Sequence, residues 1–291
     1  MHILTITLVI LSAAMHAGRN YLTKRAADKQ AFVWWYEVVG LMLFTPLFIV
    51  YLPAAEFAAV DIWVFILVSG IVHFIYWIFL TRALESGDLS LVYPIMRASP
   101  ALVLLFSVVF LDEAVSRQGA CGILLVALGS YAINLRGFGM KTLLQPLKQV
   151  TRDRATQFAF LTLLSVAAYS IVDKVAVGQV HPVIFAYTYP WVSMLCYSVY
   201  LFRGKRQGEI ANEWRIHRKS IIGCGFLSIF GYFLILLAFT LERVSYVVGL
   251  RQISILFAVG LGGMALGEQY RRVRFTAASI IFVGTFLIAT G

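Results

Sequence analysis

Long apolar runs recur along the whole chain, separated by short polar segments. Each run is close to the about 20 residues that an α-helix needs to cross about 30 Å of hydrocarbon. Because the runs are continuous rather than alternating, they predict helices and not the strands of a barrel. The pattern therefore predicts an all-α membrane protein with ten transmembrane helices. The expected spans are residues 3–22, 31–52, 62–81, 90–111, 119–135, 157–177, 183–202, 219–240, 245–267 and 275–290.

The composition supports a lipid environment for these helices. Of the 291 residues, 60% are hydrophobic and 13% are charged, and the mean hydropathy is +0.84. This leaves too little polar surface to coat a water-soluble globule. We therefore expect the lipid bilayer as a partner, and a multi-pass integral protein of a bacterial inner membrane.

The formal net charge of +10 is explained by where the basic residues lie. If the chain crosses the membrane ten times, 19 of its 24 lysines and arginines fall on one side. Basic loops mark the cytoplasmic side of membrane proteins, so both termini are expected outside and these loops in the cytoplasm. The charge therefore needs no nucleic-acid partner to explain it.

Matched residues recur at a nearly constant offset, which indicates two related halves. Leu84-Glu85 matches Leu241-Glu242, Gly129 matches Gly284, and all matched positions are 153 to 157 residues apart. A unit with an odd number of spans reverses its orientation on duplication, so two inverted five-helix repeats around a central cavity are predicted. We expect the first repeat at residues 1–136, a cytoplasmic linker at 137–156 and the second repeat at 157–291.

Two arginines lie inside predicted spans, where each charge costs about 2.5–3.5 kcal/mol unless it faces a cavity or a partner. Arg97 follows Tyr93-Pro94 and Arg251 follows Val248-Gly249, so each is expected just after an irregular point of its helix. A guanidinium binds carboxylates and phosphates in a two-pronged geometry, which favours an anionic or zwitterionic small-molecule substrate. The alternative is that Glu37 or main-chain carbonyls hold both arginines as structural contacts.

Two further ionisable residues are candidates for proton coupling. Glu37 lies about two turns into the second span, and a carboxyl group inside the bilayer can bind and release a proton. The alternative for Glu37 is a fixed ion pair with Arg97. His73, near the middle of the third span, could share the proton work or could be a neutral histidine hydrogen-bonded between helices.

Polar residues occupy matching places in the two halves. His16, Asn20 and Lys24 follow one another at intervals of four and so share one face of the first helix, and Tyr169 and Asp173 repeat this interval in the sixth span. These stripes are candidates for the wall of a shared cavity. The alternative is anchoring at the membrane interface, where Tyr and Lys are common.

Several short motifs occur in a fixed order across both halves. They are His16-Ala17 with Asn20 and Lys24, Tyr93-Pro94 with Arg97 and Pro100, Leu111-Asp112-Glu113, Ala168-Tyr169-Ser170-Ile171-Val172-Asp173-Lys174, Leu250-Arg251-Gln252 with Ser254, and Leu266-Gly267-Glu268. In this order they resemble the EamA-type members of the drug/metabolite transporter superfamily, and the resemblance covers essentially the entire chain.

The resemblance implies a ten-helix fold with a central cavity, and export or exchange of small metabolites such as amino acids, coupled to a proton or a counter-substrate. Two positions depart from the family pattern: Arg19 replaces the usual tryptophan before Asn20, and Asp112 stands where glycine is commoner. With the motif residues included, the candidate substrate-binding residues are Arg97, Arg251, His16, Asn20, Tyr93, Tyr169, Asp173 and Gln252.

We therefore expect a secondary transporter, an exporter or exchanger, that acts as a monomer or homodimer. The chain has no metal-type spacing of His, Cys and Asp, no GxSxG motif and no phosphate-binding glycine loop. No catalysis, no cofactor and no metal are expected. The alternatives are a polytopic membrane enzyme and a membrane protein that does not transport.

Overall fold

The computed structural model describes residues 1–54, 60–86, 89–133, 135, 139–150, 152–204, 207–257 and 271–291. The elements of this part of the chain are all helices, and seven of the helices are long and apolar enough to cross a membrane. The prediction of an all-helical membrane protein is confirmed, whereas the number of ten spans stays a prediction. The last part of the predicted span 245–267 and the motif Leu266-Gly267-Glu268 lie outside the described residues.

Contacts between residues divide the chain into two compact units, and neither unit is one half of the sequence. Unit 1 consists of Met1–Ile10, Ile75–Ile171 and Glu242–Gly291. Unit 2 consists of Leu11–Phe74 and Val172–Leu241. Each unit therefore takes helices from both halves of the sequence. The predicted repeat boundaries at residues 136 and 157 stay a prediction.

Unit 2 is organised around a close contact between α2 and α10. A Cβ atom added to Gly40 would lie 3.0 Å from the main-chain oxygen of Gly225, so these helices touch through small residues. The helices of unit 2 are α2 (Lys29–Tyr51), the 3-10 helix η1 (Leu52–Ala54), α9 (Pro182–Gly204), α10 (Gln207–Leu241) and parts of α1 (Ile3–Lys24), α3 (Val60–Ser86) and α8 (Arg154–Val177).

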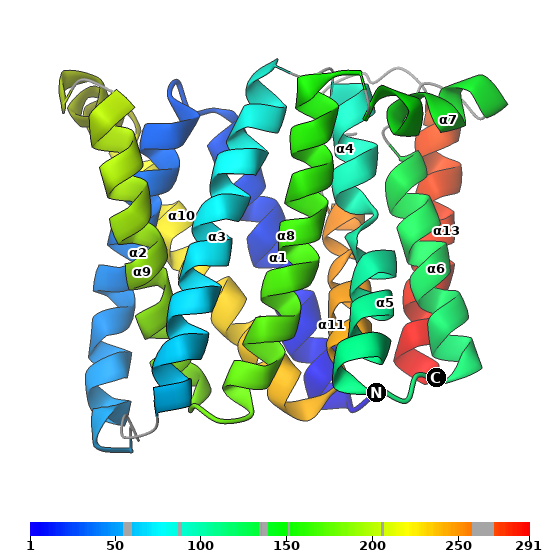
Figure 1. The fold of residues 1–291 in the computed structure, drawn as a ribbon, viewed down its shortest axis with the longest axis horizontal. Coiled ribbons are helices and arrows are strands. Elements are labelled where there is room, and N and C mark those ends of the chain that lie inside the picture. The colour runs from blue at the N-terminus through cyan, green and yellow to red at the C-terminus, as the bar shows by residue number, and fades with distance from the viewer. Residues whose placement is uncertain are drawn as a thin grey trace. The chain divides into compact units, whose positions relative to one another are not determined.

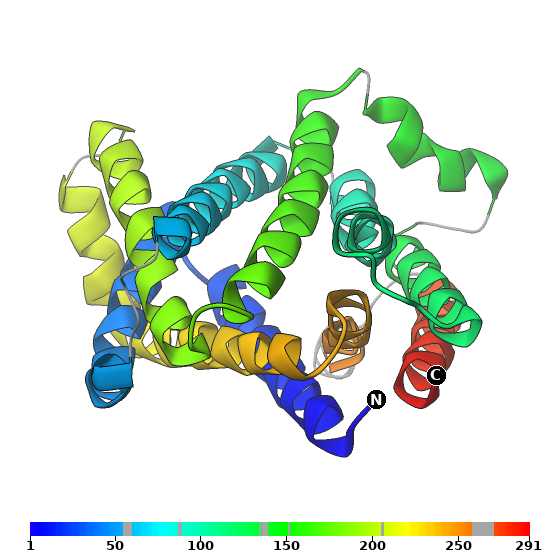
Figure 2. The same ribbon diagram turned by 60° about the horizontal axis from the view of Figure 1, so that its bottom comes forward.

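Unit 1 has an equivalent close pair, α6 and α13, which run side by side in both views (Figures 1 and 2). A Cβ atom added to Gly122 would lie 2.8 Å from the main-chain oxygen of Gly284. In both units, small residues thus join a helix from the first half to one from the second. Besides parts of α1, α3 and α8, unit 1 contains α4 (Leu89–Arg97), α5 (Ser99–Leu111), α6 (Arg117–Ala132), α7 (Met140–Gln149), α11 (Val244–Arg251) and α13 (Arg271–Thr290).

Side-chain caps explain where several helices begin. Asp28 accepts hydrogen bonds from the main-chain nitrogens of Gln30 and Ala31 at the start of α2. Asp153 accepts them from the hydroxyl and the main-chain nitrogen of Thr156 at the start of α8, and these bonds hold the pKa of Asp153 below its usual range. These caps satisfy main-chain donors that a helix leaves unpaired in its first turn.

Two helices are interrupted, and the breaks follow the arginines rather than precede them. Arg97 is the last residue of α4, and α5 starts at Ser99 with Pro100 in its first turn. The proline ring disfavours helical geometry in the residue before it and lacks a main-chain donor, so it starts a new helix well. Arg251 is likewise the last residue of α11. The predicted break points at Tyr93-Pro94 and Val248-Gly249 were wrong by about one turn, because Pro94 is accommodated inside α4.

Two helical segments differ from the expected pattern. The linker predicted at 137–156 contains a helix, α7, whose Leu143 carbonyl accepts a hydrogen bond from the Tyr131 hydroxyl. Helix α10 begins at Gln207, twelve residues before the predicted span, and contains a non-helical residue at His217. Both segments mix charged and apolar residues, so their mean hydropathy does not mark them as spans.

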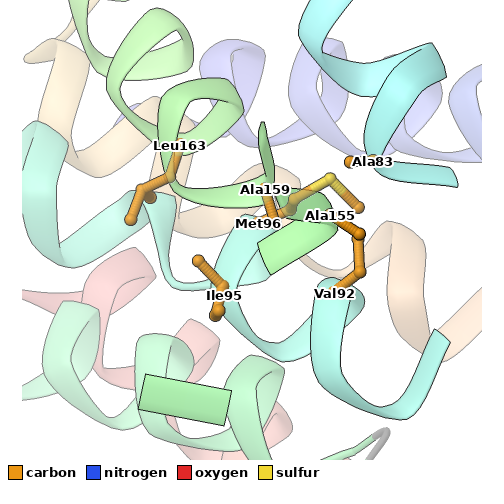
Figure 3. Packing of buried hydrophobic residues seen from close by; sticks show 7 residues of the cluster. All are labelled: Ala83, Val92, Ile95, Met96, Ala155, Ala159 and Leu163. Carbon is orange, nitrogen blue, oxygen red and sulfur yellow. The ribbon is translucent and has the colours of Figure 1, made fainter. Parts of the chain in front are cut away.

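A small apolar cluster packs the beginning of α8 against α3 and α4 within unit 1 (Figure 3). Alanines on α3 and α8 leave room for the longer side chains of α4, so the helices approach closely. The cluster consists of Ala83, Val92, Ile95, Met96, Ala155, Ala159 and Leu163.

Asp112, which ends α5, has a left-handed main-chain conformation with φ 50° and ψ 35°. This conformation costs an L-residue about 1–2 kcal/mol, least for Gly, Asn and Asp. We expect Asp112→Val to lower the free energy of unfolding by about 1–2 kcal/mol, and Asp112→Gly to change it by less than about 1 kcal/mol. Thermal unfolding of the detergent-purified protein measures this, and a valine variant as stable as the wild type would contradict it.

Candidate functional site

A buried carboxyl group lies where three helices of unit 2 meet. Asp173, near the end of α8, has an exposed fraction of 0%. Its Oδ1 accepts a hydrogen bond of 2.6 Å from the Ser69 hydroxyl on α3, and its Oδ2 accepts one of 2.5 Å from the Tyr232 hydroxyl on α10. His73 Nε2 lies 3.8 Å from the same Oδ2. Asp173 is thus held by groups from two other helices.

A main-chain carbonyl of α3 determines which nitrogen of the His73 ring carries a proton and which one faces Asp173. His73 Nδ1 lies 2.9 Å from the main-chain oxygen of Ser69, one turn earlier in the helix. A carbonyl oxygen only accepts hydrogen bonds, so Nδ1 carries a proton. In a neutral imidazole, the Nε2 that faces Asp173 is then unprotonated. Lone pairs of the two side chains would face each other unless one of them holds a proton, so the pair is suited to hold one exchangeable proton.

Close packing between α3 and α9 keeps His73 in this position. The His73 ring lies 4.6 Å from the Tyr189 ring, centroid to centroid, and meets the Tyr232 ring edge-on at 5.6 Å. Gly70 allows this approach, because a Cβ atom added there would lie 2.5 Å from the Cβ of Val192. The small residue on α3 therefore allows the close packing that holds His73 beside Asp173.

A second polar cluster in unit 2 joins α1, α2 and α10. The Ser228 hydroxyl on α10 donates to Glu37 Oε1 at 3.1 Å and accepts from Arg19 Nη1 at 3.4 Å. On α1, Arg19 Nη2 lies 3.0 Å from His16 Nδ1, and His16 Nε2 lies 3.1 Å from Asn20 Nδ2. All of these side chains except Ser228 are partly exposed. The cluster is therefore polar and can be reached from outside the unit.

Helix α10 carries one residue of each cluster on the same face. Ser228 and Tyr232 are four residues apart, which corresponds to one turn and about 6 Å of rise. Ser228 contacts Glu37 and Tyr232 contacts Asp173. The contacts to Glu37 and to Asp173 are therefore neighbours along one face of α10.

The arginines predicted to bind substrate belong to unit 1. Arg97 and Arg251 are both partly exposed, and each ends a short helix. The last carbonyls of a helix carry partial negative charge, so a guanidinium is favoured at this place. Both arginines also sit where the main chain leaves helical geometry, which is where irregular backbone lines polar sites in membrane proteins.

A model of the EamA-like transporter family matches this chain twice, at residues 3–135 and 154–290. The chain belongs to the EamA-like transporter family. It is therefore a membrane transporter of the drug/metabolite transporter superfamily with two sequence repeats, as the resemblance predicted. A comparison with curated proteins finds no match.

One solved crystal structure resembles this EamA-like chain over nearly its full length. It covers 99% of this chain and 96% of its own, with a TM-score of 0.71 and a sequence identity of 14%. At this identity the similarity concerns the fold alone. It supports the helical architecture of this family member and leaves its substrate open.

The predicted site residues of this EamA-like transporter divide between the two units. Unit 2 contains His16, Asn20, Glu37, His73 and Asp173, and unit 1 contains Tyr93, Arg97, Tyr169, Arg251 and Gln252. The alternative pairing of Glu37 with Arg97 stays a prediction, because these residues belong to different units. The side chain of Lys24, the third member of the α1 stripe, lies outside the described residues.

The remaining candidates of unit 1 are tyrosines and an amide. Tyr93 packs against the cluster of Figure 3, and the buried Tyr169 meets the Tyr76 ring edge-on at 5.6 Å. Gln252 is buried next to the break after Arg251, and its Oε1 has no hydrogen-bond partner among the described residues. An unpaired buried acceptor at a helix break is a suitable contact for a donor group of a ligand.

Sequence reasoning missed Ser69, Arg19, Ser228 and Tyr232 as parts of the two clusters. The available signal was spacing: Ser69 precedes His73, and Ser228 precedes Tyr232, by four residues. Serine and tyrosine are common in membrane helices, so this spacing alone does not single out a site.

An open groove of about 570 Å³ also lies in unit 2, between α3 and α9. Its lining is mostly apolar, with Arg203 as the charged residue. The residues are Phe74, Cys196, Val199, Tyr200, Arg203 and Gly204. Such a lining does not suit a charged metabolite, which needs several polar partners when it leaves water. Among the described residues, no group of His, Cys, Asp and Glu is arranged to hold a metal ion.

Proposed function

We propose that this EamA-like transporter is a proton-coupled secondary transporter of a small anionic or zwitterionic metabolite, such as an amino acid, acting as an exporter or exchanger in a bacterial inner membrane. One observation carries the proposal: the fully buried Asp173 forms a pair with His73 inside unit 2. An ionisable pair at such a place is costly and is typical of proton pathways in transporters.

The geometry of the pair supports exchange of a single proton. His73 Nδ1 is committed to the main chain, so Nε2 and Asp173 Oδ2 are the atoms that gain or lose the proton. Ser69 and Tyr232 donate to Asp173 and would stabilise its charged form after the proton has left. Tyr232 lies on α10, the helix that also contacts Glu37 through Ser228, so movement of α10 would link the proton site to the second cluster.

The direct test uses purified protein in lipid vesicles. We expect at least one amino acid or organic acid from a panel to accumulate when a pH gradient is imposed. The accumulation should return to the level of protein-free vesicles when a protonophore removes the gradient. Transport that continues unchanged without the gradient would overturn proton coupling, and no transport of any metabolite in the panel would overturn the proposed substrate class.

The two arginines of unit 1 provide a further prediction. Arg97→Ala and Arg251→Ala should each lower the flux of anionic and zwitterionic substrates by about tenfold or more, since each removes a guanidinium at a helix break. Arg117→Ala, at the exposed start of α6, is the matched control and should leave the flux unchanged. Normal flux in both variants at wild-type protein levels would remove these arginines from the substrate path.

A further inference from the structure

Helix α7 lies at one end of the helices of unit 1 and runs across their direction. In Figure 1 its axis is transverse to α6 and to α13, which contains the candidate span Val273–Thr290. Leu143 of α7 packs against a buried cluster that includes Ala132, the last residue of α6, and Ala277, in the second turn of α13. The helix is therefore level with the ends of these two helices and parallel to the membrane plane, as an interfacial helix is.

One side of α7 is apolar and exposed. Met140, Leu144 and Leu147 follow one another at intervals of four and three, which places them along one side of the helix. Their exposed fractions are 69%, 38% and 56%. Pro146 is buried and Leu143 is half-buried, so α7 packs against unit 1 through a different side. The exposed apolar stripe, Met140, Leu144 and Leu147, is thus left for a partner outside the bundle.

Basic residues border the apolar stripe. Lys141 and Lys148 are both exposed and lie seven residues apart, so they share one side of the helix next to Leu144. From 139 to 154 the sequence contains four basic residues and one acidic residue, Asp153. Lysine side chains beside an apolar stripe can reach lipid phosphates while the apolar side chains enter the acyl region. The charge of this segment therefore complements an anionic membrane surface.

We propose that α7 is an interfacial helix whose apolar stripe enters the lipid leaflet at this end of the bundle and whose lysines bind the phosphate groups of anionic phospholipids. A partner protein would also cover an apolar stripe, but the transverse orientation at the ends of the spans and the bordering lysines favour lipid. This inference concerns an interaction surface and does not rest on the proposed transport function. It places the segment between the two sequence repeats on the membrane surface.

The test compares spin labels on two adjacent residues of α7 in the full-length protein in lipid vesicles. The three native cysteines are replaced by serine or alanine, and one cysteine is introduced as Leu144→Cys or as Gln145→Cys. Collisions of the label with oxygen, which concentrates in lipid, are compared with collisions with a nickel chelate, which stays in water. The ratio of oxygen to nickel collisions should be several-fold higher at 144 than at 145, because Gln145 is exposed on the side away from the stripe.

Thermal unfolding checks that both labelled variants are folded, which is expected because both positions are on the surface of α7. Equal collision ratios at 144 and 145 in folded protein would overturn the inference. A label at 144 that is shielded from both oxygen and nickel would also overturn it, since that result indicates a protein partner over the stripe.

Lipid composition tests the role of the lysines. The spectrum of the label at 144 separates helix that is docked in lipid from helix that is not. The ratio of docked to undocked helix should rise when phosphatidylglycerol is added to phosphatidylcholine vesicles. A lysine near an anionic surface changes such an equilibrium by about fivefold, so Lys141→Gln should remove about that factor in the anionic vesicles and have no effect in phosphatidylcholine alone.

Lys29→Gln is the matched control, because Lys29 is an exposed lysine at the start of α2, and it should leave the ratio unchanged in both kinds of vesicle. The double variant Lys141→Gln, Lys148→Gln should lose the response to phosphatidylglycerol. A response that persists in the double variant, or a wild type that does not respond to phosphatidylglycerol, would overturn the binding of anionic phospholipids by these lysines.

Discussion

Replacing Asp173 by asparagine is expected to abolish transport driven by a proton gradient, with a loss of about 100-fold or more. Asparagine has nearly the same shape and can still accept from Ser69 and meet the Tyr232 hydroxyl, so the three helices should keep their contacts. It cannot ionise, so His73 loses the partner with which we propose that it shares a proton. Exchange of labelled for unlabelled substrate, which needs no net proton movement, should persist in this variant.

Two measurements check the expected result for Asp173→Asn. Accumulation under a pH gradient should fall to the level of protein-free vesicles, while exchange at equal pH should continue. Asp153→Asn is the matched control, because Asp153 lies just before α8 and caps its start outside the candidate span Arg154–Val177, so this variant should keep gradient-driven accumulation. Gradient-driven accumulation that equals the wild type in Asp173→Asn would place proton coupling elsewhere in the protein.

Adding one methyl group at Gly70 is expected to damage both stability and transport. In Gly70→Ala the new Cβ would lie 2.5 Å from the Cβ of Val192 and 2.8 Å from the main-chain oxygen of Tyr189. Neither atom is the end of a flexible side chain, so α3 and α9 must move apart. Such overpacking costs about 1–3 kcal/mol in the free energy of unfolding.

The same movement would displace the residues on either side of Gly70 along α3. Ser69 and His73 would shift relative to Asp173, and misplacement by about 1 Å can lower a rate by about 100-fold. Thermal unfolding and gradient-driven flux should therefore both decrease in Gly70→Ala. Gly223→Ala is the control in the same unit, because its new Cβ would meet only Leu22 Cδ1 at 3.7 Å, an ordinary contact. Equal losses in the two variants would show that the close packing at Gly70 has no special role.

The candidate site could be predicted only in part. Charged residues inside spans stand out because a bilayer excludes them, which is why Glu37 and His73 were recognised as candidates, whereas Asp173 was recognised from its four-residue spacing after Tyr169. Their partners Ser69, Ser228 and Tyr232 are polar but uncharged, and such residues are tolerated in many membrane helices. Which of them face a carboxyl group depends on the rotation of each helix about its axis, and hydropathy does not determine this rotation.

The positions of the helix breaks could also be predicted from the sequence only in part. The prolines near Arg97 predict an irregular helix, but either Pro94 or Pro100 could cause the break. The break follows Arg97, because Pro100 takes a position in the first turn of α5 where its missing N–H group costs nothing. Glu113 then caps the start of α11, accepting from Val244 N at 2.6 Å and from the Ser245 hydroxyl at 2.7 Å. No local pattern pairs a glutamate of the first half with a helix start in the second.

The sequence by itself determined that this protein is helical, spans a membrane and has two related halves. It also determined that the chain belongs to the EamA-like transporter family. These properties follow from local composition, because lipid offers no partner for an unpaired peptide group and so forces apolar segments into helices. The tertiary structure alone decided which helices form a compact unit. Unit 2 joins α2 to α10 and unit 1 joins α6 to α13 through glycines in close contact. Because lipid and protein interiors are similarly apolar, close packing of small residues selects the partners. The tertiary structure likewise decided that Asp173 on α8 lies beside His73 on α3.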